Sequence, residues 1–389
     1  MRLLIAFDKF KDTLSAPRAC ELVRAELIRL APEAFVETAP ISDGGDGFCE
    51  VLTRSANGVM ETVSVSGPLG KPVSAKLGFI DGAQLSPETW IALRLKPCRR
   101  LAVVEMAQAS GLHWLTPAER NPWVTTSGGT GELLLAAARG GAEAIVLGIG
   151  GSATNDCGLG ALATLGLECR DSNGSLIPCP TPANWNQIAS LSGHSLASLP
   201  PLRIACDVEN PLLGPQGASG VFGPQKGLRE VAEMEATMEM LSARLCQTFQ
   251  RDPAVRMWPG AGAAGGLGFG LMTAFGAEFV SGFEVVESWL ALEQKLAAAD
   301  LVITGEGCFD ASSLGGKGPG TLVRRVQNRN GRVLVLAGRI APEVQVTLAN
   351  QVGLELIAIT PPGMALAEAL AHSERLLVEA VRTYWTRAA

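Results

Sequence analysis

The sequence has no run of basic residues: 32 Lys and Arg are spread along the chain against 38 Asp and Glu, for a net charge of −6. A nucleic-acid or anionic-membrane partner would require a basic patch, so the charge pattern argues against both. The N-terminal segment has five apolar residues in a row before charges begin, which is too short for a signal peptide or a spanning helix. We therefore expect a cytoplasmic protein with no membrane or nucleic-acid partner.

Cysteine and histidine patterns of known sites are also missing. The 9 cysteines form no C-x-x-C pair, and with the 3 histidines they show no zinc spacing. An odd number of cysteines fits reduced thiols better than a disulfide framework. The histidines offer neither a Ser–His–Asp triad nor a His-based metal site. No period of 20–50 residues repeats along the chain.

What the sequence does contain is a set of short apolar runs. With 389 residues and 47% hydrophobic content, the chain suits two domains. Fully apolar runs are typical of strands buried on both faces of a parallel sheet. The predicted strands at the two ends of the chain are residues 2–7, 35–42, 300–304, 332–338 and 354–360. The predicted helices between and after them are residues 15–30, 48–58, 321–331 and 366–385. This alternation predicts a doubly wound parallel α/β sheet built from both termini.

The middle of the chain has a different pattern. Residues 62–67, 72–80 and 90–95 alternate in polarity, as antiparallel strands do. The simplest architecture is an α/β domain of residues 1–62 plus 291–389, with residues 63–290 as an inserted mixed α+β domain. We expect an active site in the cleft between the two domains.

Polar residues that suit phosphate chemistry follow three of the predicted strands. In an open parallel sheet, ligands bind beyond the carboxyl ends of the strands. The segments after these strands carry Asp8, Lys9, Lys11, Asp43, Gly44, Gly45, Glu306, Asp310 and Lys317. Carboxylates can hold Mg²⁺, lysines neutralise phosphate oxygens, and glycine N–H groups cradle them. Each residue could instead serve as a helix cap, a turn residue or a solvated charge, but three such loops favour a metal–phosphate site.

The central segment adds a second set of candidates. Residues 150–156 follow a predicted strand and precede a helix, an arrangement that binds anions at the helix N-terminus. Residues 126–130 have a similar pattern. Further polar residues at strand ends or in turns are Glu105, Asp207, Asn210 and Lys226. Taken singly, each is as compatible with a structural role as with a functional one.

Two glycine-rich segments match known signatures only in part. Residues 260–265, GAGAAG, fit the dinucleotide fingerprint, but no convincing strand precedes them. The segment around Lys317 lacks the earlier glycine and the following Ser or Thr of a Walker A loop. A nicotinamide-dependent dehydrogenase is therefore only a minor possibility.

Together the motifs resemble the bacterial type I glycerate kinases, the glycerate 2-kinase family. The matching stretches, in the family's order, are AFDKFKDTLSA, PISDGGDG, VEMAQASGL, ERNPWVTTSGGTGELL, GIGGSATND, ACDVENPLLG, GASGVFGPQKG, GAGAAGGLG and DLVITGEGCFD with GGKGPG. The resemblance implies transfer of the γ-phosphate of ATP to D-glycerate with Mg²⁺, giving 2-phosphoglycerate, or else 3-phosphoglycerate. It also implies that the domain from both termini is flavodoxin-like.

Phosphoryl transfer requires positioning and charge neutralisation more than covalent chemistry. On the resemblance, we expect Asp43 or Asp310 to accept the proton of the glycerate hydroxyl. Asp8 and Glu306 are expected to hold Mg²⁺, with Asp207 as a further metal or hydroxyl contact. The residues expected to bind substrate or phosphate are Lys9, Lys11, Gly44, Gly45, Gly150, Gly151, Ser152, Thr154, Asn155, Asp156, Asp207, Asn210, Lys226 and Lys317.

The sequence departs from the family pattern at Cys308, where the family commonly has Arg, and at Cys157, where it has Gly. An arginine at 308 would clamp a carboxylate or phosphate bidentately, which a cysteine cannot do. Either another base, such as Lys317 or Arg339, takes that role, or an arginine is not needed there. The residues are also compatible with a kinase of another small hydroxy acid and with a non-catalytic ligand-binding regulator. Monomer and homodimer both fit the sequence.

Overall fold

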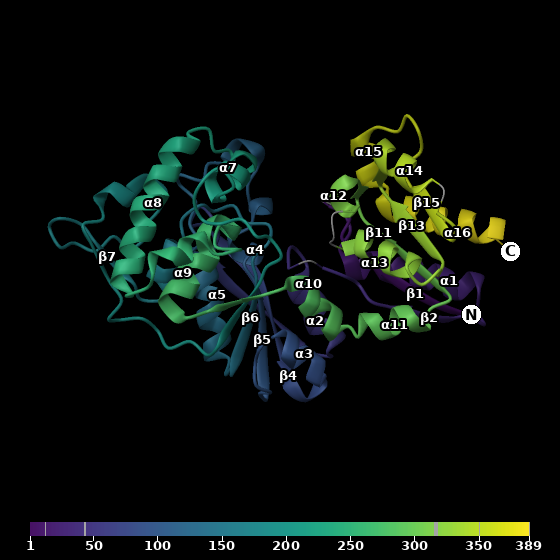
Figure 1. The fold of residues 1–389 in the computed structure, drawn as a ribbon, viewed down its shortest axis with the longest axis horizontal. Helices are drawn as coiled ribbons and strands as arrows, with labels where there is room; N and C mark the ends of the chain where they lie inside the picture. The colour runs from purple at the N-terminus through teal and green to yellow at the C-terminus, as the bar shows by residue number, and fades with distance from the viewer. Residues whose placement is uncertain (12, 43, 315–317, 350, 389) are drawn as a thin grey trace. The chain divides into compact units, whose positions relative to one another are not determined.

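A computed structural model describes residues 1–11, 13–42, 44–314, 318–349 and 351–388. The chain divides into two compact units: Met1–Asp43 with Val286–Ala389, and Gly44–Val285. The first unit thus combines the two ends of the sequence, purple and yellow in Figure 1. Its limits differ from residues 62 and 291 because helix α2 (Phe48–Ser55) packs on strands β4 (Pro72–Asp81) and β5 (Arg100–Glu105) of the second unit.

Strands and helices alternate in the first unit. Its elements are β1 (Arg2–Phe7), α1 (Ala16–Leu30), β2 (Phe35–Thr38), α11 (Leu292–Ala298), β11 (Leu301–Gly305), β12 (Cys308–Phe309), α12 (Ala311–Leu314), α13 (Gly318–Gln327), β13 (Val333–Ala337), β14 (Arg339–Ile340), α14 (Pro342–Leu348), β15 (Leu354–Ala358), α15 (Leu366–Ala371) and α16 (Ser373–Ala388). The main sheet has the order β15-β13-β11-β1-β2, with every neighbouring pair parallel. Numbered within the unit, this is the order 2-1-3-4-5 of one common doubly wound sheet. The predicted parallel sheet drawn from both termini is confirmed.

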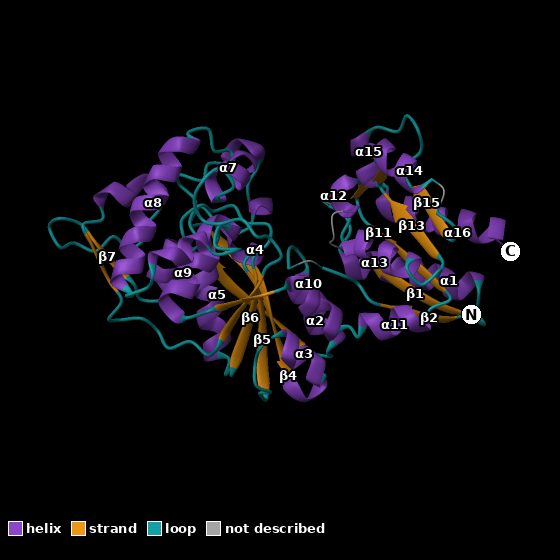
Figure 2. Ribbon diagram, in the orientation of Figure 1, coloured by secondary structure: helices purple, strands orange, loops and turns teal. Residues whose placement is uncertain are grey.

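Strand β1 is buried on both faces, as its unbroken apolar sequence predicts. Leu3, Ile5 and Phe7 belong to one buried cluster with residues of α1 and α16. Leu4 is equally buried, and its side chain points to the opposite face because side chains alternate along a strand. Helix α13 packs on β11 and β13. Helices therefore cover both faces of this sheet (Figure 2).

The second unit contains a mixed sheet. Its further elements are β3 (Val59–Ser66), α3 (Pro87–Ala92), α4 (Ala107–Ser110), α5 (Gly128–Arg139), β6 (Ala144–Gly148), α6 (Leu159–Thr164), β7 (Glu168–Arg170), β8 (Ser190–Ser192), β9 (Leu202–Ala205), α7 (Ala218–Phe222), α8 (Val231–Thr248), α9 (Leu267–Phe275) and β10 (Glu278–Val280). The sheet order is β10-β9-β6-β5-β4-β3. The pairs β3–β4 and β4–β5 are antiparallel and the others are parallel. The parallel half brings the carboxyl ends of β5, β6 and β9 to one edge.

Two predicted elements differ from the structure. Residues 90–95, predicted as a strand, lie in and directly after helix α3. Ser86 accepts a hydrogen bond from the Thr89 N–H at 3.2 Å and Pro87 occupies the first turn, so the local cap outweighs the alternating pattern. The single helix predicted over residues 366–385 is divided into α15 and α16, with His372 as the C-cap of the first. None of the helices described has the length and apolar character that a bilayer-spanning segment needs.

Candidate active site

The carboxyl edge of the second unit's parallel strands is built around the buried side chain of Glu105. Glu105 ends β5 and is 1% exposed. Its Oε2 accepts hydrogen bonds from the N–H groups of Gly47 and Cys49 at the start of α2, both at 3.1 Å. Burial raises the pKa of Glu105 to about 7, and the negative charge of Asp46 adds to this effect. The sequence alone assigns no role to Glu105. Its hydrogen-bond partners lie 56 and 58 residues away along the chain, so no local pattern indicates them.

The loop before α2 and the loop after β6 pack backbone against backbone at this edge. The Gly150 N–H donates to Gly44 O at 3.1 Å. A Cβ on Gly150 would lie 2.4 Å from Gly45 Cα, and a Cβ on Gly151 would lie 2.4 Å from Asp46 Oδ1. The backbone contact leaves room only for glycine at position 150, and at position 151 the positive φ of 75° favours glycine. The structure therefore brings four of the predicted binding glycines together.

Asp156 is fully buried and caps the helix that follows it. Its carboxylate accepts hydrogen bonds from the N–H and hydroxyl of Ser127 at 2.8 and 2.7 Å, and from the N–H groups of Gly158 and Gly160 at 3.1 and 3.2 Å. Helix α6 begins only at Leu159 and has six residues. Asp156 itself thus places a negative charge at this helix N-terminus, and its contact with a bound anion stays a prediction. Burial raises the pKa of Asp156, opposed by these hydrogen bonds.

Thr154, Asn155 and Lys226 also lie in the interior of the second unit. Lys226 Nζ donates to Thr154 O at 2.7 Å, so it supports the loop from inside, and its contact with a phosphate stays a prediction. Burial lowers the pKa of Lys226 to about 7, and the charge of Asp156 opposes this only in part. Gly151 is exposed, so the first half of the loop is the part that reaches solvent.

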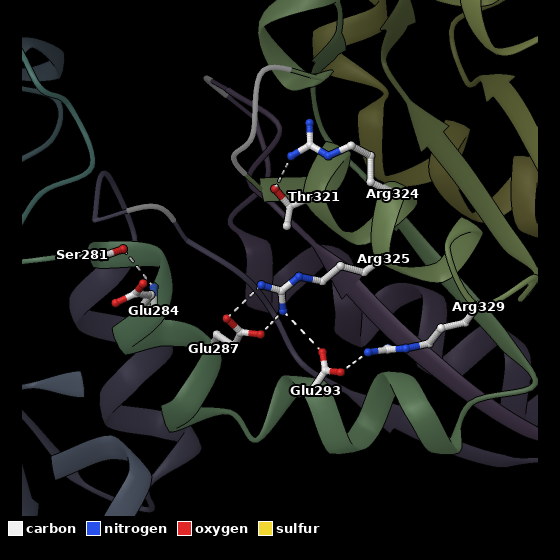
Figure 3. Close-up of polar contacts among 8 residues, drawn as sticks. All are labelled: Ser281, Glu284, Glu287, Glu293, Thr321, Arg324, Arg325 and Arg329. Carbon is white, nitrogen blue, oxygen red and sulfur yellow. Dashed lines mark hydrogen bonds and ion pairs between the residues drawn. The ribbon is translucent and has the colours of Figure 1, made fainter. Parts of the chain in front are cut away.

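Asp207 and Asn210 hold backbone segments near the end of β9. Asp207 Oδ1 accepts the Ser281 hydroxyl at 2.7 Å, and its Oδ2 accepts the Phe283 N–H at 2.9 Å. Ser281 also accepts the N–H of Glu284 at 3.2 Å, at the start of helix α10 (Gly282–Trp289; Figure 3). The Asn210 amide donates to a backbone carbonyl at 2.8 Å. Asp207 thus anchors α10, and its contact with a metal or hydroxyl stays a prediction.

In the first unit, Asp8 and Glu306 follow neighbouring parallel strands. Phe7 and Gly305 are Cα partners, so Asp8 and Glu306 are the next residues on strands that lie about 4.8 Å apart. Asp8 Oδ1 accepts the N–H of Lys9 at 2.6 Å. Carboxylate oxygens suit Mg²⁺. Across the residues the structure describes, no three His, Cys, Asp or Glu side chains lie close enough together to hold a metal ion.

Other predicted residues lie at the same edge. Asp310 precedes α12, where its Oδ1 accepts the Ser313 N–H at 3.4 Å. The backbone of Lys11 lies beside the loop after β11, since a Cβ on Gly307 would be 3.2 Å from the backbone nitrogen of Lys11. The predicted residues Asp43 and Lys317 lie outside the described residues.

Helix α13, which follows the predicted lysine segment, is held by an ion-pair network (Figure 3). The network consists of Arg325, Arg329, Glu287 and Glu293. Arg325 binds both carboxylate oxygens of Glu287, with Nη2 to Oε2 at 3.1 Å. A Cβ on Gly318, the first residue of α13, would lie 3.5 Å from Asp8 Oδ2. The network therefore fixes a helix whose N-terminus lies at the candidate site.

The GAGAAG segment lacks the context of a dinucleotide site. A 3₁₀ turn, Pro253–Met257, precedes it where the fingerprint requires a strand. A Cβ on Gly262 would lie 2.0 Å from Pro211 O, so this glycine permits close packing.

Comparisons with known proteins cover almost the whole chain. The family model described as "Glycerate kinase family" matches residues 3–387. The Bacillus subtilis (strain 168) protein named glycerate kinase is 37% identical over 392 residues, 98% of this chain and 96% of that protein. The Escherichia coli (strain K12) protein named glycerate 2-kinase is 36% identical over 366 residues, 92% of this chain and 90% of that protein. A Salmonella typhimurium LT2 crystal structure, provisionally named glycerate kinase 2, superposes with a TM-score of 0.76 at 34% identity, covering 100% of this chain and 98% of that one.

Proposed function

The chain belongs to the glycerate kinase family and is an ATP-dependent phosphotransferase, and we propose that it phosphorylates the 2-hydroxyl of D-glycerate to give 2-phosphoglycerate. The observation that carries this proposal is the 36% identity, across 92% of the chain, to the Escherichia coli protein named glycerate 2-kinase. The strand order of the first unit supports the flavodoxin-like class that this family implies. The family resemblance also supports a cytoplasmic location.

The proposed step is a single phosphoryl transfer. The 2-hydroxyl oxygen of glycerate bonds to the γ-phosphorus while the bond to the β–γ bridging oxygen breaks, and ADP leaves. The hydroxyl proton passes to a carboxylate, which we assign to Asp43 or Asp310. Support for Asp310 is its place directly after β12, in the segment that follows the carboxyl end of β11.

The remaining roles are electrostatic. Asp8 and Glu306 would hold Mg²⁺, which when bound with ATP would neutralise charge on the phosphates. Lys9, Lys11 and Lys317 would neutralise further phosphate oxygens. In the second unit, the exposed part of the Gly150–Ser152 loop would offer N–H groups to an anion, while Asp156 and Lys226 hold that loop in shape.

A coupled assay of ADP release tests the proposal. Glycerate should support turnover, whereas glycerol, which lacks the carboxylate, should not. Lactate and tartronate distinguish a general hydroxy-acid kinase from a glycerate kinase. Turnover with lactate and not with glycerate would refute the assignment.

A further inference from the structure

Arg339 stands at the carboxyl edge of the first unit's sheet on a rigid backbone. It is exposed and begins β14, and Gly338 alone separates it from the end of β13 at Ala337. The Gly338 N–H donates to Glu306 O at 3.0 Å, and the Arg339 N–H donates to Gly307 O at 3.1 Å. These bonds fix its Cα opposite that of Cys308 in a parallel pair. The side chain therefore starts from a defined point next to the Asp8–Glu306 pair.

The guanidinium has weak partners for its five donors. Nη2 lies 3.6 Å from Cys308 Sγ, and this thiol in turn contacts Asp310 Oδ2 at 3.8 Å. Within the described ranges, no carboxylate lies at ion-pair distance from Arg339, whereas Arg325 and Arg329 of the same unit are both paired with glutamates. A thiol is a poor hydrogen-bond acceptor, so the guanidinium can still bind two oxygens of one carboxylate or phosphate at once.

We propose that Arg339 binds an oxyanion of the reactants, either the carboxylate of glycerate or a phosphate of ATP. The inference rests on the proposed kinase function, because it places both anions at this edge. Carboxylate and phosphate share the bidentate geometry that a guanidinium recognises and that an ammonium does not. If Arg339 were only a solvated surface charge, its removal would leave catalysis unchanged.

Because Cys308 is paired with Arg339, the proposal can be tested by moving the arginine from position 339 to position 308. Residues paired on neighbouring strands have Cα atoms about 4.8 Å apart, within the reach of an arginine side chain. Arg339→Ala should raise KM for one reactant by about 10-fold or more, and Arg339→Lys should recover little of the loss. Adding Cys308→Arg to Arg339→Ala should return KM to within about 3-fold of the wild-type value.

A rise in KM for glycerate identifies the carboxylate as the ligand, and a rise in KM for ATP identifies a phosphate. Arg375→Ala, which removes an exposed arginine of α16 paired with Glu379, is the matched control and should leave both constants unchanged. Unchanged constants in Arg339→Ala, or a loss that Cys308→Arg does not rescue, would overturn the proposal while the kinase assignment stands. A wild-type chain without glycerate-dependent ADP release would instead refute the kinase function, and this inference with it.

Discussion

The buried carboxyl of Glu105 should lower the free energy of unfolding as pH rises, and Glu105→Gln should remove this pH dependence. Burial raises the folded-state pKa from 4.5 to about 7. An acid whose pKa is higher in the folded than in the unfolded state binds its proton more tightly when folded. The free energy of unfolding therefore falls as pH rises from about 4.5 to about 7, and levels off above that.

The size of this effect follows from the same shift. At about 1.4 kcal/mol per pKa unit, the difference between 4.5 and about 7 corresponds to about 3 kcal/mol. Gln keeps a carbonyl acceptor for the N–H groups of Gly47 and Cys49 and does not titrate in this range. As pH rises from about 4.5 to about 8, the free energy of unfolding of the Gln variant should therefore increase relative to that of the wild type by about 3 kcal/mol.

Urea unfolding of the full chain across this pH range measures the difference, and hydrogen exchange of the peptide spanning α2 locates it. Glu50→Gln is the matched control, because Glu50 lies on α2 and pairs with Arg54 near the surface. The control should follow the wild-type pH dependence. Parallel curves for wild type and Glu105→Gln would refute the reasoning, because the carboxyl would then have no raised pKa.

Three further substitutions have defined outcomes. Lys226→Met should abolish the gain in stability that the buried lysine gives the wild type between about pH 7 and about pH 10.5, because in this range the unfolded chain still holds a proton that the folded chain has released. Matching pH dependences in thermal unfolding would contradict this. Arg325→Met removes the pair with Glu287, so it should lower the melting temperature and reduce the free energy of unfolding by about 1 kcal/mol or more at low salt. A stability difference that salt leaves unchanged would argue against the ion pair. Asp43→Asn and Asp310→Asn should each lower kcat by at least ~10²-fold with circular dichroism unchanged; near-normal turnover in both would remove the assignment of the base.

Buried strands were the part of the fold that local sequence predicts best. The apolar runs at residues 2–7 and 332–338 have one stable solution, burial on both faces of a parallel sheet, and both form such strands. Residues 90–95 were mispredicted because a cap four residues upstream decides between helix and strand. The limits of the two units depend on what α2 packs against, which no local pattern encodes.

The candidate site shows the same division between local and long-range information. The loops after the strands were predictable, since parallel strands bring their carboxyl ends to one edge. The role of Asp156 was not, because its partner Ser127 lies 29 residues away. The glycine-rich turn before a helix indicates an anion site, but it does not show that the Asp156 carboxylate caps the start of this helix. The pairing of Cys308 with Arg339, 31 residues later, depends in the same way on the register of two strands.

The measurement that tests the central claim most directly is ³¹P NMR of the reaction product. The purified chain is incubated with ATP, Mg²⁺ and D-glycerate, and the phosphorylated acid is compared with authentic 2- and 3-phosphoglycerate. We predict 2-phosphoglycerate, with ADP formed in equal amount. Phosphate on the terminal hydroxyl would contradict the proposed position of transfer, and the absence of any phosphorylated glycerate would contradict the assignment as a glycerate kinase.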